Sequence, residues 1–247
     1  MGQTGTIYGQ AFQAYAERVS ISSAREIVPI VLSIMPIRSV LDVGCVRGTW
    51  LSVWHGKGID DFLGIDGDYV KAETLGIDPD RFIRRDLGQP FRLGRKFDLV
   101  QCLEVAEHLP GDRARGFIAD LAAHGRVVLF SAAPPGQGGK WHINEQPYSY
   151  WRAHFADEGF VLVDCIRPLL QRRAEVAPWY RFNTFLFVHS DVIGQLPPSI
   201  RSFELNIDDA VPDVSPFLYR ARKSLIRLLP FRIKQLLADA VERTHPS

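Results

Sequence analysis

Between residues 38 and 190 the chain alternates short, β-rich apolar runs with segments whose apolar residues recur at helical spacing. The apolar runs lie at 38–44, 61–66, 81–87, 97–103, 126–133, 161–166 and 181–190. Helical spacing occupies 49–58, 112–125 and 146–160. Strands that alternate with helices at this pitch form parallel sheets covered on both faces. The pattern therefore predicts an α/β fold with a doubly wound, mostly parallel, seven-stranded sheet.

The two flanks of this region have different patterns. Residues 10–19 and 24–35 have helical spacing and predict a pair of N-terminal helices. The segment after residue 190 is rich in proline and acidic residues, which is typical of a linker. The expected parts are N-terminal helices in 1–35, the sheet domain in 36–190, a linker-like segment in 191–215 and a basic amphipathic helical tail in 216–247.

The composition fits one sizeable core, because 46% of the 247 residues are hydrophobic. The net charge of +1 hides a segregation: six of the 29 basic residues and none of the 28 acidic ones lie in 217–236, so the remainder carries −5. A remainder of that sign does not attract nucleic acid. Three widely spaced cysteines, no signal-peptide core and no bilayer-length apolar stretch predict a cytoplasmic protein.

Glycines and acidic residues follow the first three strands. Doubly wound sheets bind ligands beyond the carboxyl ends of their strands. Gly44 and Gly48 would let the backbone turn sharply and let a ligand approach the next helix closely. Asp66 ends the second strand, where an acid can accept hydrogen bonds from a ribose diol, and Asp86 follows the third. The pattern predicts a nucleotide-containing ligand.

In order and spacing, these segments resemble the motifs of the class I S-adenosylmethionine-dependent methyltransferases. The resemblance covers roughly residues 36 to 190 and rests on LDVGCVRG, GIDGD, RRDL, FDLVQCLEVAEHLP and VVLFSAAPP. It implies a Rossmann-like sheet, S-adenosylmethionine as cofactor and methyl transfer as the reaction. The cofactor-binding residues that it implies are Asp42, Gly44, Cys45, Gly48, Asp66, Gly67, Asp86, Leu87 and Leu103.

The glycine loop departs from the family pattern at one position. The usual run is Asp-x-Gly-x-Gly-x-Gly, and Val46 replaces the middle glycine. A β-branched residue does not readily adopt a positive φ, so we expect Val46 to be right-handed or the loop to differ slightly. A nicotinamide dehydrogenase is the alternative for such a sheet, but residues 44–48 do not fit its G-x-G-x-x-G pattern.

The stretch CLEVAEHLP, residues 102–110, places Glu104, Glu107 and His108 just after the fourth strand. It is similar to the Glu-x-x-Glu-His run of metal-dependent O-methyltransferases of ubiquinone biosynthesis and of small-RNA 2′-O-methyltransferases. The latter add a histidine downstream, and His142 is the candidate here. The resemblance implies that Glu104, Glu107, His108 and His142 bind Mg²⁺, Mn²⁺ or Zn²⁺.

The same run is also common in class I methyltransferases that use no metal. In that interpretation, Glu107 and His108 cap the following helix or line the acceptor pocket. The catalytic candidates are His108, Glu107 and His142, because an imidazole near neutrality can act as a general base on an alcohol.

The acceptor side of the site is expected in residues 131–151, where prolines and glycines suit a lid unless something covers the segment. Aromatic faces and hydrogen-bonding side chains there suit a sugar, so we expect a small-molecule or glycan acceptor. Trp151 is expected to pack a helix on the sheet. RNA ranks lower as an acceptor, because no basic stripe with interleaved aromatics accompanies the catalytic region.

The basic tail has the pattern of an amphipathic helix that Pro230 interrupts. Its apolar face, which contains no tryptophan, either packs on the domain or on a second subunit, or lies on an anionic membrane. The sequence thus favours an O-methyltransferase of a hydroxylated small molecule, with or without a metal. The alternatives are a catalytically silent cofactor-binding scaffold, a carboxyl- or N-methyltransferase and an RNA 2′-O-methyltransferase.

Overall fold

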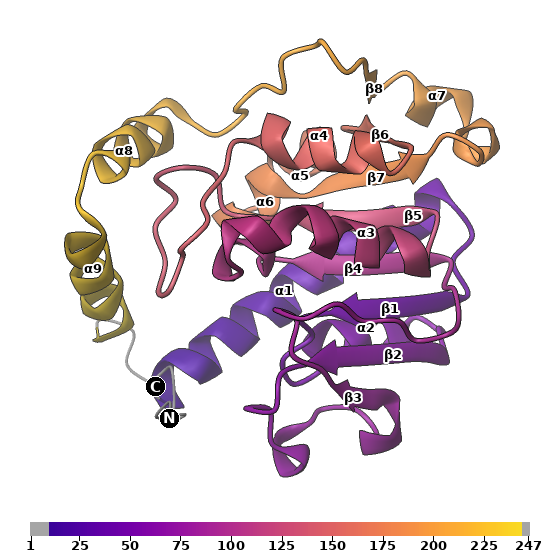
Figure 1. The fold of residues 1–247 in the computed structure, drawn as a ribbon, viewed down its shortest axis with the longest axis horizontal. Coiled ribbons are helices and arrows are strands. Elements are labelled where there is room, and N and C mark those ends of the chain that lie inside the picture. Colours follow the sequence, from indigo (N-terminus) through magenta and orange to yellow (C-terminus); the bar gives the residue numbers. More distant parts are fainter. Residues whose placement is uncertain (1–9, 244–247) are drawn as a thin grey trace.

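The computed structural model describes residues 10–243, with side chains from residue 15 to residue 240 (Figure 1). One sheet with the strand order β3-β2-β1-β4-β5-β7-β6-β8 forms its centre. Its strands are β1 (Ser39–Val43), β2 (Asp61–Asp66), β3 (Phe82–Arg84), β4 (Leu99–Leu103), β5 (Val127–Ser131), β6 (Phe160–Val163), β7 (Phe185–His189) and β8 (Glu204–Leu205). The first five strands are parallel, whereas β7 is antiparallel to both β5 and β6. The predicted doubly wound, mostly parallel sheet is confirmed, with one strand more than expected.

Helices cover both faces of the sheet, because successive strand residues point to opposite sides. Val40 and Leu99 belong to one core cluster, and their neighbours Leu41 and Val100 belong to the other. The helices that contribute to the first cluster are α1 (Gln10–Ile34), α2 (Thr49–Gly56), α5 (Ile166–Leu170) and α6 (Pro178–Asn183). Those of the second are α3 (Ala114–His124) and α4 (Tyr148–Asp157). The carboxyl ends of the parallel strands thus form one accessible edge (Figure 1).

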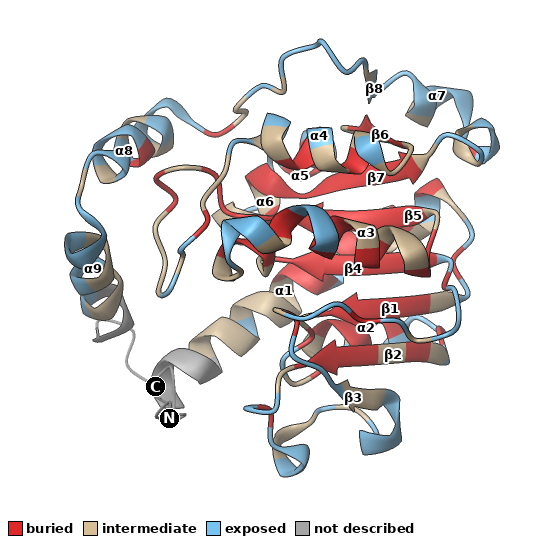
Figure 2. Ribbon diagram, in the orientation of Figure 1, coloured by how far each residue is buried: buried red, intermediate tan, exposed pale blue. Residues whose placement is uncertain are grey.

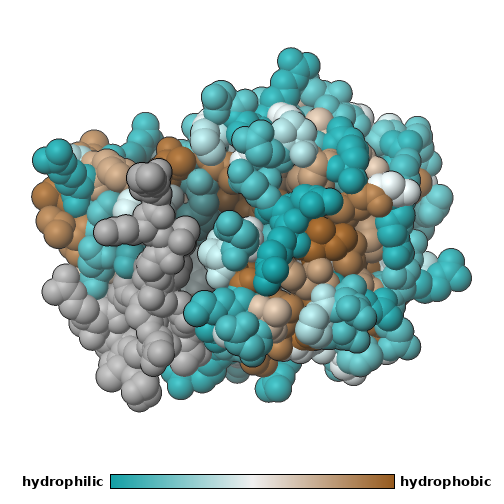
Figure 3. All heavy atoms as spheres, turned by 60° about the horizontal axis from the view of Figure 1, so that its bottom comes forward, coloured by the Kyte–Doolittle hydropathy of each residue, from teal (hydrophilic) through white to brown (hydrophobic). Residues whose placement is uncertain are grey.

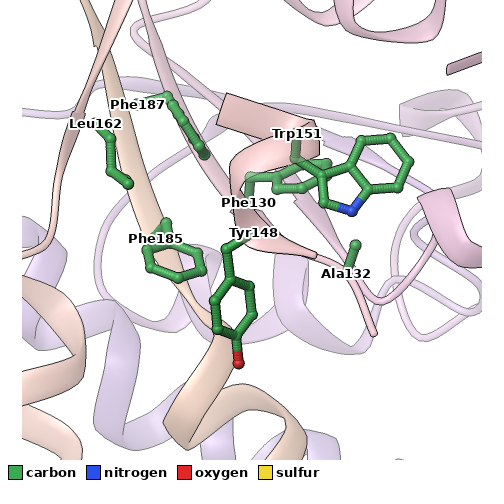
Figure 4. Close-up of a pocket in the computed structure, with 7 residues that line it drawn as sticks. All are labelled: Phe130, Ala132, Tyr148, Trp151, Leu162, Phe185 and Phe187. Carbon is green, nitrogen blue, oxygen red and sulfur yellow. The ribbon is translucent and has the colours of Figure 1, made fainter. Parts of the chain in front are cut away.

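The α4 face of the sheet is packed largely with aromatic rings. Trp151 lies 5.6 Å from Phe130 between ring centroids, so it packs on the sheet as expected, and Phe155 stacks on Phe187 at 3.9 Å. A void of about 10 Å³ remains there (Figure 4). Its lining residues are Phe130, Ala132, Tyr148, Trp151, Leu162, Phe185 and Phe187. A space of about one water molecule is a packing defect of the core and cannot hold a cofactor.

The N-terminal part is one continuous helix, α1, and not the predicted pair. The serines between the two expected helices make hydrogen bonds within or beside this helix. Ser23 Oγ donates to the Val19 carbonyl at 2.8 Å, and Ser22 Oγ donates to the Glu175 carbonyl at 3.0 Å. Packing of α1 on α2 and α5 then outweighs the low helix propensity of the segment.

The segment predicted as a linker, 191–215, is tied to the domain and supplies the extra strand. It contains α7 (Pro198–Arg201) and β8, which pairs antiparallel with β6. Two buried arginines of the domain hold it through its carbonyls: Arg152 donates to Asp209 O at 2.6 Å, and Arg167 donates to Pro212 O at 2.9 Å. Composition alone does not indicate such anchors, because they belong to other helices.

The tail forms the two helices α8 (Phe217–Arg227) and α9 (Phe231–Arg243), separated at Pro230 as the sequence indicated. They lie beyond the carboxyl edge of the sheet, next to the loop that joins β5 to α4 (Figure 1). Most of their residues are exposed, so packing of the apolar face on the domain, one of the three alternatives for the tail, does not occur (Figure 2). No helix within residues 10–243 has the length and apolar character needed to cross a bilayer.

Candidate active site

The loop after β1 turns through two glycines that have no room for a side chain. Gly44 has φ 83° and Gly48 has φ 78°, which are left-handed values that suit glycine. A Cβ on Gly44 would collide with the side chain of Val105, and one on Gly48 would lie 2.7 Å from Ile77 Cγ1. The contact between Gly44 and Val105 brings the loop after β1 against the E-V-A-E-H segment after β4.

Val46 has a positive φ of 49°, so the first of the two alternatives, a right-handed Val46, is wrong. Two features of its surroundings explain this. Its amide donates to Asp66 Oδ2 at 2.7 Å, which fixes the backbone, and its side chain is 52% exposed, which avoids a clash. The loop therefore keeps the course that a glycine would allow, at a strain of roughly 1–2 kcal/mol.

Asp66, at the end of β2, is buried, and its carboxylate is paired by its own loop and by the loop after β1. Its carboxylate accepts the amides of Val46 and Gly67, each at 2.7 Å, and the hydroxyl of Tyr69 at 2.5 Å. Burial raises the pKa of Asp66, and these three hydrogen bonds oppose the rise. Tyr69, which the sequence analysis did not single out, supplies a hydroxyl to the carboxylate that a ribose diol would need.

Asp42, near the end of β1, is buried and is less well paired. Its Oδ2 atom has no hydrogen-bond partner among the described residues. Burial raises the pKa of Asp42 to about 7, and the nearby charge of Asp66 adds to the rise. A cationic or hydrogen-bond-donating ligand would relieve this cost.

The other predicted cofactor residues lie along the same edge. Cys45 follows β1, Leu103 ends β4, and both are buried. Asp86 and Leu87 follow β3, where exposed Asp86 accepts the Gly88 amide at 2.9 Å and Leu87 is buried. The carboxyl edge of the sheet from β3 to β4 therefore carries both acidic and apolar side chains.

On the acceptor side, Glu104 begins the segment after β4 with φ 58°, another left-handed value for a residue with a side chain. Its Oε2 accepts Gln137 Nε2 at 2.6 Å. A buried chain of hydrogen bonds continues: Asn183 donates to Gln137 at 2.6 Å, and the Tyr148 hydroxyl donates to Asn183 at 2.7 Å. Gln137 and Asn183 were not predicted, because only the fold brings loop, α6 and α4 together.

Glu107 is completely buried, and neither of its carboxylate oxygens makes a hydrogen bond of regular geometry among the described residues, although the Glu104 carboxyl and the amides of Glu107 and Ala133 lie near them. Burial raises the pKa of Glu107 well above its usual value, and the neighbouring charge of Glu104 raises it further. One oxygen of Glu104 is likewise without a partner. Buried carboxylate oxygens of this kind are stabilised by a proton, a cation or a metal ion.

Two histidines lie beside these carboxylates, with the His108 and His142 rings perpendicular and 4.9 Å apart between centroids. His108 Nδ1 lies 3.2 Å from the Trp141 carbonyl, and His142 Nδ1 lies 3.2 Å from Glu145 Oε1. A carbonyl or a carboxylate can only accept, so Nδ1 carries a proton in both rings, and in the neutral form of each ring Nε2 presents the lone pair. This orientation is the one that metal-binding histidines adopt.

Three of the four predicted metal ligands come together. Ligand atoms of Glu107, His108 and His142 all lie within 4.8 Å of one another, whereas Glu104 lies outside this group and holds Gln137. Burial and the nearby His142 lower the pKa of His108 to about 4. His108 is therefore neutral near pH 7, which is the form that can bind a metal.

The loop at 134–147 is held in place and is covered. Glu145 accepts the amides of Gly136 at 2.9 Å and Gly138 at 2.8 Å, so a carboxylate occupies the backbone donors of the glycine run. The amides of Ile143 and Asn144 both donate to the Glu107 carbonyl at 3.0 Å. The sequence allowed for a mobile lid unless something covered it, and the tail helices provide the cover.

The order and directions of the strands give a fold that solved methyltransferase structures share. No protein-family model and no curated protein matches the sequence, but many solved structures match the fold.

DesVI from Streptomyces venezuelae is similar over 72% of this chain and 96% of its own, with a TM-score of 0.56 and 19% identity. The sugar N-methyltransferase KedS8 from a Streptoalloteichus species matches over 76% and 98%, with a TM-score of 0.55 and 19% identity. Magnesium protoporphyrin IX methyltransferase (ChlM) from Synechocystis, with bound SAM, matches over 77% and 86%, with a TM-score of 0.51 and 24% identity. At these identities the likeness establishes the fold.

Proposed function

We propose that this protein transfers a methyl group from S-adenosylmethionine to a hydroxyl of a small molecule, with a sugar or related natural product as the acceptor. The observation that carries the proposal is a cluster of buried carboxylate oxygens and two histidine rings in the segments beside the cofactor loop. The contact between Val105 and Gly44 joins the two halves of the site.

The cofactor half suits S-adenosylmethionine, which would supply a methyl group on a positively charged sulfur. Asp42 has a buried, unpartnered oxygen for a cationic or donating group of the cofactor. Asp66 would accept the ribose hydroxyls once the Tyr69 hydroxyl turns away from its carboxylate. The fold shared with ChlM, whose structure contains SAM, supports this choice of cofactor.

The acceptor half suits an alcohol, because an alcohol needs a base or a metal ion before it becomes a good nucleophile. Glu107 and the Nε2 atoms of His108 and His142 would hold a divalent ion such as Mg²⁺, Mn²⁺ or Zn²⁺. Such an ion, when bound, would lower the pKa of a coordinated hydroxyl. Glu145 and the Trp141 carbonyl would keep the two imidazoles oriented.

An N-methyltransferase of an amino sugar is the second candidate. The paired carboxyls of Glu104 and Glu107 could balance an ammonium group of the acceptor in place of a metal ion. The shared fold with the sugar N-methyltransferase KedS8 supports this alternative. Amine methylation needs no metal, so a chelator separates the two candidates.

The decisive experiment begins with calorimetric titration of S-adenosylmethionine into chelator-treated protein. We expect binding without metal, because the cofactor half contains no metal ligand. Mn²⁺ binding is then followed by electron paramagnetic resonance in the wild type, in His142→Gln and in His55→Gln, whose exposed histidine lies on α2. Loss of Mn²⁺ binding in His142→Gln alone, together with metal-dependent methylation of hydroxylated sugars, is the expected result.

Other outcomes point elsewhere. Absence of cofactor binding under all conditions would leave only the silent scaffold. Cofactor binding without Mn²⁺ binding, together with chelator-resistant methylation of amino sugars, would favour the second candidate.

A further inference from the structure

The two tail helices face the domain with their polar groups. In α8, the buried Lys223 donates from Nζ to Asp213 Oδ2 at 2.5 Å, and Arg222 donates to the Gln137 carbonyl at 3.0 Å. The backbone of Lys223 lies so close to Gly136 that a Cβ there would collide with it. The packed side of α8 thus carries two cationic side chains, together with Tyr219, whose ring lies 5.7 Å from that of Phe182 between centroids.

The second tail helix is docked in the same way. In α9, Gln235 Oε1 accepts the amide of Trp141 at 3.2 Å, and Asp239 pairs with Lys140 at 3.4 Å. Both helices therefore make polar contacts with the loop at 134–147, and Ile226 of α8 also lies against this loop near Gly138. Eight large apolar side chains of the tail are left exposed.

The outward face of the tail is unusually apolar. Phe217, Leu218, Leu225 and Leu228 of α8 are 73%, 80%, 68% and 81% exposed. Exposed large apolar side chains of α9 extend this face, and together they define the tail surface: Phe217, Leu218, Leu225, Leu228, Phe231, Ile233, Leu236 and Leu237. Brown side chains at the left edge of Figure 3 lie where Figure 1 places these helices. An apolar surface of this kind normally has a partner.

Basic residues flank the tail surface. Arg220, Arg227 and Arg232 are exposed and form no ion pair within the part of the chain that the structure describes. The sequence from 217 to 236 contains no acidic residue. Two short helices with an exposed apolar face and arginines beside it have the composition of helices that lie in a lipid–water interface.

We propose that the tail surface docks this protein on an anionic lipid bilayer, with the apolar side chains among the acyl chains and Arg220, Arg227 and Arg232 at the headgroups. A second copy fits this surface less well. In a symmetric dimer the same patch would meet itself, so the flanking arginines of the two copies would face one another. A layer of anionic headgroups complements them instead.

The loop beneath the tail adds apolar groups at this edge of the molecule. Trp141, which bonds to α9 through its amide, and Ile143 both have exposed side chains. Tryptophan is favoured at the membrane interface, and the tail itself has none. The docked bilayer would lie over the same loop that holds His142, which fits an acceptor presented at a membrane. That last step rests on the proposed function, whereas the docking does not.

The test is flotation of the full chain with vesicles of phosphatidylcholine alone or with added phosphatidylserine. We expect binding to the anionic vesicles, a loss of roughly tenfold or more at high salt, and a similar loss in Arg220→Gln/Arg227→Gln/Arg232→Gln. Leu218→Gln/Leu225→Gln/Leu228→Gln should lose at least about tenfold as well. The matched control is Leu169→Gln/Phe203→Gln/Ile207→Gln, which changes exposed apolar residues outside the tail and should bind as the wild type does.

Three results would overturn the docking. One is absence of binding to anionic vesicles, and another is equal binding by the leucine variant and the wild type. The third is a dimer, detected by light scattering, that the leucine variant dissociates, because a second copy would then cover the tail surface. Cofactor titration of the same variants reports on the proposed function separately, since no substituted residue lies at the cofactor edge.

Discussion

The cofactor edge and the acceptor edge of the site both bury carboxyl groups, but they satisfy them differently. Asp66 accepts the amide of Gly67 and the hydroxyl of Tyr69 from its own loop and the amide of Val46 from the loop after β1, so its oxygens are paired before any ligand binds. Glu107 is buried without a hydrogen bond of regular geometry to either oxygen. The Asp66 carboxylate is thus satisfied by hydrogen bonds within the protein, whereas the Glu107 carboxyl depends on a proton or a cation from outside.

The largest expected effect is loss of the paired carboxylate in Asp66→Ala. The part-buried amides of Val46 and Gly67 would lose their acceptor, at a cost of up to about 1–3 kcal/mol each, because water can replace it only in part. We expect chemical denaturation to give a free energy of unfolding lower by about 2–5 kcal/mol, and S-adenosylmethionine affinity to fall at least roughly 100-fold.

The control for Asp66→Ala is Asp68→Ala, which removes an exposed carboxylate two residues away. It should leave both measurements close to those of the wild type. If Asp66→Ala bound S-adenosylmethionine as tightly as the wild type does, Asp66 would stabilise the loops but would not bind the cofactor.

For Glu107→Gln, which replaces the unpaired carboxyl by an amide, we expect a gain in the free energy of unfolding instead of a loss. Burial and the charge of Glu104 raise the pKa of Glu107, so ionising this group costs stability in the absence of a cation. A neutral amide removes that cost, and chelator-treated Glu107→Gln should be more stable than the wild type by about 1–3 kcal/mol at alkaline pH. The gain should shrink as the pH falls, because the wild-type carboxyl then takes up a proton.

Adding Mn²⁺ should reverse this order, because only the wild type would gain stability from binding the ion. Glu145→Gln is the contrasting variant: its carboxylate is already held by two amides and His142, so it should lose stability. If Glu107→Gln were already less stable than the wild type at alkaline pH without Mn²⁺, the Glu107 carboxyl would not be an unpaired group that costs stability when it ionises.

This difference also marks what the sequence could predict. Asp42, Gly44, Gly48 and Asp66 each follow or end a strand, so strand periodicity and the rule for doubly wound sheets were enough to bring them to one edge. The hydrogen-bond partner of Glu104 could not be predicted from the sequence. Gln137 belongs to a loop whose course is fixed by contacts distant in sequence, so no local pattern indicates it.

The tail is a second example of a feature that the sequence pattern predicted only in part. Amphipathic spacing predicted the helices α8 and α9 correctly but gave no direction for the apolar face. Polar contacts such as Lys223 with Asp213 decide that direction, and they arise only once the preceding segment is anchored to the domain. Packing of an apolar face on its own domain is the common outcome, and here it does not occur.

Within the cofactor edge, Asp42 is expected to make binding pH-dependent. Its pKa is raised to about 7, so the free protein carries the protonated form below that pH and loses stability as the pH rises toward it. A cationic cofactor favours the ionised form. S-adenosylmethionine affinity should therefore increase by up to about tenfold per pH unit up to about pH 7 and then level off.

Calorimetry across this pH range measures the slope, and Asp42→Asn should flatten it. S-adenosylhomocysteine retains the ammonium group but lacks the charged sulfur. A slope that persists with this ligand would identify the ammonium as the group that Asp42 senses, and a flat profile for both ligands would remove Asp42 from cofactor binding.

The smallest effect is expected at Val46, where the cofactor edge stores strain. Val46→Gly removes a left-handed φ that costs roughly 1–2 kcal/mol, but glycine loses about 0.5–1 kcal/mol more backbone entropy on folding. The free energy of unfolding should rise by at most about 1 kcal/mol. The Val46 amide still donates to Asp66 in this variant, so cofactor affinity should not fall.

Gly44→Ala, in the same loop, should be clearly destabilised, because its Cβ would meet Val105. A loss of stability in Val46→Gly would mean that the valine side chain, although half exposed, contributes more than its backbone strain costs.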